Sequence, residues 1–182
     1  LREEMAAIKA RPPLSSFGIW MLGPALLHFG TEGQKQRFLN EIARGEIRWC
    51  QGYSEPGSGS DLVSLQTYGE DKGDHWVVNG QKVWNTLAHI ADFGMLVTRT
   101  DPNVPKHRGM TYFALDMKAR GVEVRPLRQI TGEAEFNEVY MTDVRVHDEY
   151  RIGAEGEGWR AALTTLMNER TAIGGSGGGS GG

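Results

Sequence analysis

The segment Gln51–Asp61, with the sequence QGYSEPGSGSD, carries the residue types of a ligand-binding turn. Its serines supply hydroxyl groups, and Glu55 and Asp61 supply carboxylates. Gly57 and Gly59 have no Cβ, so backbone N–H groups beside them can approach a ligand closely. We therefore expect this segment to bind a flat or phosphorylated cofactor.

Two phosphate-binding motifs are excluded for this segment. It has no Gly-Lys-Ser/Thr after its glycines, and it is not a G-x-G-x-x-G sequence between a strand and a helix. A surface turn without a ligand is the alternative. The carboxylates could be taken for an acid–base pair, but structural roles explain them better. We expect Glu55 to anchor the loop and Asp61 to cap the short turn Leu62–Ser64.

Helices are predicted on both sides of this segment. Apolar residues with helical spacing run up to Gly30, with a possible kink at Pro24. Thr31 begins a T-x-x-Q capping box, which predicts a second helix that Gly45 closes. A last helix is predicted from Trp159 to Ile173.

Short strands are predicted between these helices. A turn is expected at 71–74, and Asn79-Gly80 is a tight hairpin signal. Short strands joined by hairpin turns favour an antiparallel β-barrel or sandwich, so the chain is predicted to be α+β. Further strands are predicted at Phe93–Thr98, Met110–Leu115, Gly121–Arg125 and Glu138–Val146.

Composition limits the classes of function. The chain has 182 residues, 39% of them hydrophobic, and a net charge of -3, which does not suggest a basic face for nucleic acid. No apolar run reaches the length of a membrane span, and no signal sequence opens the chain. The single Cys50 excludes an intrachain disulfide framework and a multi-thiolate zinc site, and the five histidines form no metal-ligand cluster. A cytoplasmic location is the default expectation.

Both ends indicate a piece of a longer protein. The chain starts at Leu1 instead of Met and ends in GGSGGGSGG, Gly174–Gly182. Such a composition is typical of a flexible linker or insert, native or engineered.

Several collinear motifs resemble those of the acyl-CoA dehydrogenase family. The flavin loop T/S-E-P-x-x-G-S-D of that family matches Ser54–Asp61, and N-G-x-K-x-W-x-T matches Asn79–Thr86. A later segment, F-N-E-V-x-x-x-D-V-R-V, matches Phe136–Val146, and an E-R pair stands at Glu169 and Arg170. The resemblance covers about residues 14–173.

The resemblance implies a domain organisation. Residues 1–45 would be the end of an N-terminal helical domain and 46–152 a flavin-binding middle β-domain. Residues 153–173 would be the first helix of a C-terminal helical domain, followed by the linker at 174–182. The rest of that C-terminal bundle would supply the oligomer interface, for a homo- or hetero-oligomer.

The implied reaction is the FAD-dependent α,β-dehydrogenation of an acyl-CoA thioester. A carboxylate removes the α-proton, a hydride passes to flavin N5, and the electrons go on to an electron-transferring flavoprotein. The usual base lies beyond the end of this chain, so no catalytic residue is expected in it and the isolated chain is expected to be inactive. Arg170 would lie near the thioester end of the site.

The resemblance also assigns the flavin contacts. Backbone N–H groups of Gln51–Ser54 would stabilise negative charge on the reduced ring, Trp84 would pack on it, and Thr86 would donate near N5. Without the motif, Trp84 reads as a barrel-core residue. The implied cofactor-binding residues are Gln51, Gly52, Tyr53, Ser54, Gly59, Ser60, Trp84, Asn85 and Thr86, and Ser60 also touches the acyl-CoA.

Other interpretations remain open. The chain could belong to an acyl-CoA oxidase-like flavoenzyme, or to a non-catalytic subunit that keeps the barrel for partner binding. Cys50 is expected to be a small buried apolar residue. The arginines at 120, 125 and 128 are either solvated strand charges or contacts for CoA phosphates.

Overall fold

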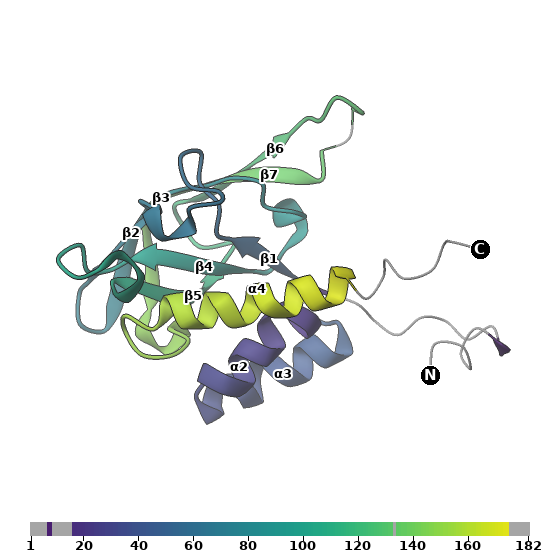
Figure 1. Ribbon diagram of the computed structural model, residues 1–182, viewed down its shortest axis with the longest axis horizontal. Helices are drawn as coiled ribbons and strands as arrows, with labels where there is room; N and C mark the ends of the chain where they lie inside the picture. Colours follow the sequence, from purple (N-terminus) through teal and green to yellow (C-terminus); the bar gives the residue numbers. More distant parts are fainter. Residues whose placement is uncertain (1–6, 9–15, 133, 175–182) are drawn as a thin grey trace.

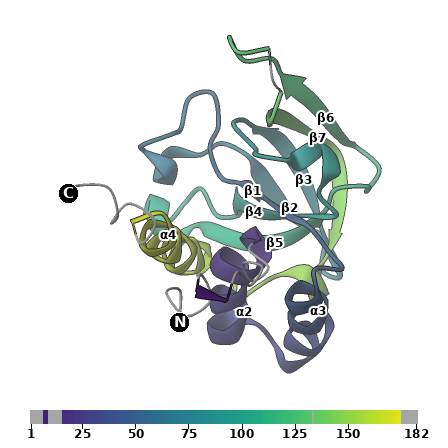
Figure 2. The same ribbon diagram turned by 90° about the vertical axis from the view of Figure 1, so that its right-hand side faces the viewer.

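A curled seven-stranded sheet with helices on one side makes up the structure (Figures 1 and 2). The computed structural model describes residues 7–8, 16–132 and 134–174, so the predicted glycine-rich tail from 175 onward lies outside the described residues. The helices are α2 (Gly23–Phe29), α3 (Glu32–Arg44) and α4 (Gly158–Gly174). The strands are β1 (Trp49–Gly52), β2 (Tyr68–Asp71), β3 (His75–Lys82), β4 (Phe93–Arg99), β5 (Met110–Asp116), β6 (Val122–Leu127) and β7 (Phe136–His147).

The sheet is mixed. Its order is β1-β4-β2-β3-β7-β6, and β5 pairs with β4. The strand β4 runs parallel to β1, with Trp49 opposite Phe93, and touches β2 in parallel at one position, while the other pairs are antiparallel. The predicted α+β class is confirmed, and the sheet is partly parallel instead of purely antiparallel. Because the long excursion through β2 and β3 returns the chain to the same end, β4 enters beside β1 in the same direction.

The hairpin predicted at Asn79-Gly80 is wrong. These residues lie inside β3, where its pairing with β7 shifts register between Val78 and Gly80. Gly80 has φ +154°, and a Cβ there would lie 2.5 Å from Thr67 Oγ1, so the glycine allows a close approach of two chain segments. The turn between β2 and β3 lies at Gly73 (φ +93°), within the turn predicted at 71–74, which is confirmed.

The helix predicted up to Gly30 is divided in two. A π-helical turn, Gly18–Leu22, comes first, and Gly23 N–H donates back to Gly18 O. Pro24 lies in the first turn of α2, where its missing N–H costs nothing, so it starts the helix instead of kinking it.

The predicted capping box of α3 is confirmed. Gln34 N–H donates to Thr31 Oγ1 (3.2 Å), and Thr31 N–H donates to Gln34 Oε1 (3.0 Å). Gly45 ends the helix with φ +70°. The same Gln34 side chain also fastens α3 to the end of the sheet, because its Nε2 donates to the carbonyls of Glu149 (2.7 Å) and Arg151 (2.8 Å).

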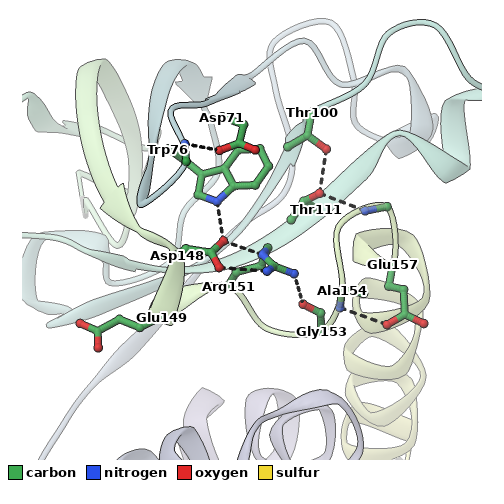
Figure 3. A network of polar contacts seen from close by, with 12 residues as sticks. Asp71, Trp76, Thr100, Thr111, Asp148, Glu149, Arg151, Gly153, Ala154 and Glu157 are labelled. Carbon is green, nitrogen blue, oxygen red and sulfur yellow. Dashed lines mark hydrogen bonds and ion pairs between the residues drawn. The ribbon is translucent and has the colours of Figure 1, made fainter.

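A polar network holds the segment after β7, as Figure 3 shows. Arg151 donates to both carboxylate oxygens of Asp148, at 2.7 and 2.9 Å, and Trp76 Nε1 donates to Asp148 at 2.8 Å. Arg151 also donates to Gly153 O. The hydrogen bonds from Arg151, and then from Trp76, outweigh desolvation and lower the pKa of Asp148.

Two apolar cores follow from this layout. One joins the helices to the sheet, where Phe38 meets Trp49 edge-on and Trp49 stacks on Phe93 with ring centroids 5.0 Å apart. The other lies inside the curl of the sheet and includes Phe113 and Val144, both fully buried. Within the described part of the chain, no helix is long and apolar enough to cross a membrane.

Candidate functional site

The two motif segments that sequence reasoning selected lie in contact. The serine–glycine loop, Tyr53–Asp61, follows β1, and the tryptophan turn, Val83–Leu87, follows β3. Val83 N–H donates to Ser54 O (2.9 Å), and Asn85 Nδ2 donates to Gln51 O (2.5 Å). We call the loop and the turn together the cradle.

A buried ion pair fastens the end of β3, from which the tryptophan turn continues, to the serine–glycine loop. Lys82 Nζ donates to Glu55 Oε1 (2.9 Å) and to Tyr53 O (3.0 Å). The two charged residues are 1% and 7% exposed. Glu55 also accepts from the backbone N–H groups of Gln66 (2.6 Å) and Thr67 (2.8 Å). The predicted anchoring role of Glu55 is therefore confirmed.

Burial and charge pairing shift the pKa values of Glu55 and Lys82 in opposite directions. Burial alone would raise the pKa of Glu55, but the charge of Lys82 and the hydrogen bonds from Thr67, Lys82 and Gln66 outweigh it and lower that pKa. Burial lowers the pKa of Lys82 to about 8, because desolvation of the ammonium exceeds the attraction of Glu55. At neutral pH Glu55 is an enclosed carboxylate with its oxygens occupied, which does not suit a proton-abstracting base.

The tryptophan turn presents an exposed indole on a strained backbone. Trp84 is 63% exposed, so its interpretation as a barrel-core residue is wrong. The backbone φ of Trp84 is +61° and that of Leu87 is +58°. Residues other than glycine rarely adopt this left-handed region. The backbones of Asn85 and Asn137 exchange two hydrogen bonds (3.0 and 3.1 Å), and Asn137 Nδ2 donates to Asn85 O. These hydrogen bonds keep the turn in its strained backbone conformation. Strained backbone of this kind is common at ligand-binding sites.

The tip of the serine–glycine loop is open. Gly59 and Ser60 are exposed, and a Cβ at Gly57 or Gly59 would meet no protein atom within 4 Å. The chain's own packing therefore does not require glycine there, and the backbone faces space that a ligand could use. Gly52 differs, because a Cβ there would lie 3.2 Å from Met95 O inside the sheet.

The predicted short turn forms at Leu62–Ser64 and Asp61 precedes it, but the Asp61 side chain makes no capping hydrogen bond to a backbone N–H, so that part of the prediction is wrong. Ser64 N–H donates to the backbone O of Asp61 (3.1 Å), and the Ser64 hydroxyl donates to its carboxylate. The Asp61 carboxylate thus stabilises the turn by accepting from the Ser64 hydroxyl instead of from a backbone N–H.

Other predicted site residues point elsewhere or are only partly exposed. The side chain of Tyr53 enters the core, where its hydroxyl donates to Tyr112 Oη (3.0 Å), which lies 3.5 Å from Thr165 Oγ1. Burial raises the pKa of Tyr112 to about 12, so both phenols stay protonated, and only the backbone of Tyr53 is available to a ligand. Thr86 is half-buried. Cys50 is buried as predicted, and burial raises its pKa to about 12.

Sequence reasoning missed two residues. Lys82 lies inside the quoted N-G-x-K-x-W-x-T motif, which was the available signal for it. Glu169, on α4, stood in the E-R pair without a role of its own. It is half-buried, and Gln51 Nε2 donates to its Oε2 at 3.5 Å, which brings a carboxylate of α4 to the base of the cradle. Arg170 is exposed.

An apolar hollow of about 450 Å³ lies beside the tryptophan turn. Its lining includes Leu87, Ile90, Trp20 and Trp49. Trp49 is 4% exposed and its Nε1 has no hydrogen-bond partner among the described residues.

The arginines at 120, 125 and 128 are all exposed. Arg125 pairs with Glu123 (2.8 Å) and lies over the ring of Tyr140. These contacts favour the interpretation as solvated strand charges. The part of the chain that the structure describes contains no group of three His, Cys, Asp or Glu residues that could hold a metal ion.

The cradle fits the flavin that the resemblance implies. A rigidly held, exposed indole can cover a flat ring, and the open backbone of the loop tip can approach a polar edge. The buried Oδ1 of Asn85, beside these surfaces, lacks a partner among the described residues. Polar atoms of this kind are normally satisfied by a partner or a ligand.

A family model supports this interpretation. The model of the acyl-CoA dehydrogenase middle domain matches residues 50–144, which include both halves of the cradle.

Named relatives and a solved structure agree with that match. The acyl-CoA dehydrogenase FadE34 of Mycobacterium tuberculosis (strain ATCC 25618 / H37Rv) is 49% identical over 171 residues, 94% of this chain and 24% of that protein. The acyl-CoA dehydrogenase IpdE1 of the same strain is 47% identical over 168 residues, 92% of this chain and 44% of that protein. The structure named Tcur3481-Tcur3483 steroid ACAD G363A variant has a TM-score of 0.82 and 36% identity, and the match covers 87% of this chain and 42% of that one. The chain thus spans less than half the length of each.

Proposed function

This chain belongs to the acyl-CoA dehydrogenase family, and we propose that it carries the flavin-binding part of an oxidoreductase that dehydrogenates an acyl-CoA thioester. The observation that carries the proposal is the exposed Trp84, held on a strained turn and fastened to the serine–glycine loop. Such a rigid aromatic surface beside an open backbone suits a flat, polar-edged cofactor. The proposed domain limits are those of the sequence analysis, with the flavin-binding domain at 46–152.

The chain's own residues would hold FAD from two sides. Trp84 would cover one face of the ring and exclude water, and Thr86 would donate a hydrogen bond near N5. Backbone N–H groups of Gln51–Ser54 would stabilise negative charge at the pyrimidine edge. Gly59 and Ser60 would face the flavin and the acyl-CoA. When bound, FAD supplies the acceptor for the hydride that leaves the β carbon.

The reaction also needs a carboxylate that takes the α-proton. Family resemblance places the usual base beyond residue 182. The geometry adds one candidate within the chain, because Glu169 lies half-buried at the base of the cradle. Glu55 is enclosed by its partners and Asp61 is bonded to Ser64, so neither is free for this role.

The substrate proposal follows from the hollow beside the cradle. Its apolar wall suits a bulky apolar acyl group, and one matched structure is named a steroid ACAD. We propose an acyl-CoA with a polycyclic or branched acyl group, in a cytoplasmic homo- or hetero-oligomer that passes electrons to an electron-transferring flavoprotein. Turnover rates with a panel from straight-chain to polycyclic acyl-CoA esters would rank the substrates.

The decisive experiment compares this chain with the longer protein that contains it. The longer protein should purify with the yellow absorbance of bound flavin and reduce an artificial electron acceptor when acyl-CoA is added. Residues 1–182 alone should retain little FAD and show no turnover, because the bundle and the usual base are missing. Robust turnover by the short chain would contradict that part of the proposal. Hydrogen peroxide production in air would instead assign an oxidase, and absence of flavin from the longer protein would favour a non-catalytic subunit.

A further inference from the structure

Lys82 carries a charge in a place where charge is costly. It is 1% exposed, and it lines a small internal cavity together with Leu96, Val139 and Met141. Replacing a buried ion pair by apolar residues of similar volume is often neutral or stabilising. A contribution to stability therefore does not explain why an ammonium group lies at this position.

The contacts of Lys82 define the position of the serine–glycine loop. Both acceptors of its ammonium, Tyr53 O and Glu55 Oε1, belong to that loop. Glu55 in turn accepts from Gln66 and Thr67, so the carboxylate that Lys82 contacts is itself fixed. The backbone of Glu55 also exchanges two hydrogen bonds with that of Ser58 (3.0 Å each), which closes the loop on itself.

The tryptophan turn begins directly after Lys82. Val83 N–H donates to Ser54 O, and the next residue, Trp84, has φ +61°. A positive φ on a large side chain persists only where the surroundings determine the backbone. The end of β3 is thus fixed to the loop by Lys82 before the chain enters its strained turn.

We propose that Lys82 is a positioning residue whose ammonium fixes the serine–glycine loop against the tryptophan turn, so that the two surfaces facing the flavin keep one separation. The proposal rests on the proposed function for the identity of the ligand. Loss of the ammonium should leave the cradle competent for binding only part of the time, which lowers the apparent affinity in proportion.

The test uses the variants Lys82→Met and Glu55→Gln, singly and together, in the full-length protein. The first readout is backbone amide hydrogen exchange of residues 53–61 and 83–87 without FAD. The second is the Kd for FAD, with the shape of the visible flavin band, at a temperature where every variant is folded. Lys82→Met should speed exchange in both segments, weaken FAD binding about tenfold or more, and change the flavin band. The double variant should lose little more than Lys82→Met, because the two residues act as one unit.

Asp148→Asn is the matched control. It breaks another ion pair of the β-domain, between Asp148 and Arg151, which has no contact with the cradle in the described residues. It should lower the melting temperature but leave exchange in the cradle and the Kd for FAD unchanged.

Two results would overturn the proposal. One is cradle exchange in Lys82→Met that matches Asp148→Asn, and the other is faster exchange with an unchanged Kd for FAD. If even the unmodified protein binds no FAD, the proposed function fails. The exchange data then still decide whether Lys82 holds the two segments together.

Discussion

At the scale of single residues, substitutions of Trp84 should have separate effects on FAD affinity and on the stability of the fold. Replacement by Gly removes the strain of a positive φ, whereas replacement by Ala keeps it. We therefore expect Trp84→Gly to be more stable than Trp84→Ala by about 1 kcal/mol, because L-residues pay roughly that cost in the left-handed region. Both variants should bind FAD more weakly, since the indole is lost. Urea unfolding and FAD titration check the two expectations.

Asp143 provides the control for that pair, because it also has a positive φ (+49°) but lies on β7 away from the cradle. Asp143→Gly should leave the affinity for FAD unchanged. A Trp84→Gly protein that binds FAD as tightly as the unmodified protein would contradict the role assigned to the indole.

The Glu55 carboxylate gives a pH-dependent contribution to stability. Its pKa in the folded chain lies below the ordinary value of 4.5, so the unfolded chain binds the proton more readily. The contribution is therefore complete well above pH 4.5 and is lost as the pH falls through the folded value. Glu55→Gln should be less stable than the unmodified protein by about 3 kcal/mol at pH 7, because Lys82 is left buried without its charged partner.

Urea unfolding from pH 7 to pH 3 tests this sign. The difference in free energy of unfolding between the unmodified protein and Glu55→Gln should shrink as the pH falls below about 4.5. A difference that stays constant across this range would show that the Glu55 charge does not stabilise the fold.

Residue roles were predictable where a local pattern determines them. The anchoring role of Glu55 and the burial of Cys50 followed from residue type and motif position. The motif pointed to Lys82, but its burial was not predictable, because a lysine in a strand is normally exposed and only the three-dimensional approach of the loop creates its buried acceptors. The exposure of Trp84 also depends on the tertiary position of its turn.

At the scale of elements, the cap of α3 both begins the helix and links it to the segment after β7. Thr31 and Gln34 form the capping box, but only Gln34 reaches the carbonyls of Glu149 and Arg151. Thr31→Ala should cost about 1 kcal/mol, the usual value of an N-cap. Gln34→Ala should cost about 2–3 kcal/mol, because it also leaves two carbonyls without their donor. Equal losses in urea unfolding would contradict the linking role of Gln34.

Elements with local signals were predicted well, and those set by distant partners were not. The Thr31–Gln34 spacing and Gly45 located α3 without reference to the rest of the chain. The Asn79-Gly80 signal failed because the same dipeptide suits a turn and a bulge, and only the approach of Thr67 decides between them. The parallel pairing of β1 with β4 leaves no trace in either strand's own sequence.

At the scale of the whole molecule, α4 is coupled to the cradle at two places. Tyr53, Tyr112 and Thr165 form a buried chain of hydroxyl groups from the loop to the helix. Gln51 donates to Glu169 one turn further along α4. These two contacts therefore fix the position of α4 relative to the cradle.

Glu169→Gln in the longer protein tests where the base lies. If Glu169 takes the α-proton, the variant should keep FAD and bind acyl-CoA but lose at least about a hundredfold in kcat, the lower range of general-base catalysis. Stopped-flow measurement of flavin reduction would report the step directly. Unchanged flavin reduction would place the base beyond residue 182, as the family resemblance implies.

The parallel pairing of Trp49 with Phe93 has a consequence for biosynthesis. Because β1 pairs with no described strand except β4, its place in the sheet stays undefined until residues 93–96 have left the ribosome. The serine–glycine loop continues from β1, so it has no fixed scaffold during that interval. The flavin proposed for the cradle would therefore stabilise the finished domain and would not guide the nascent chain through its early folding.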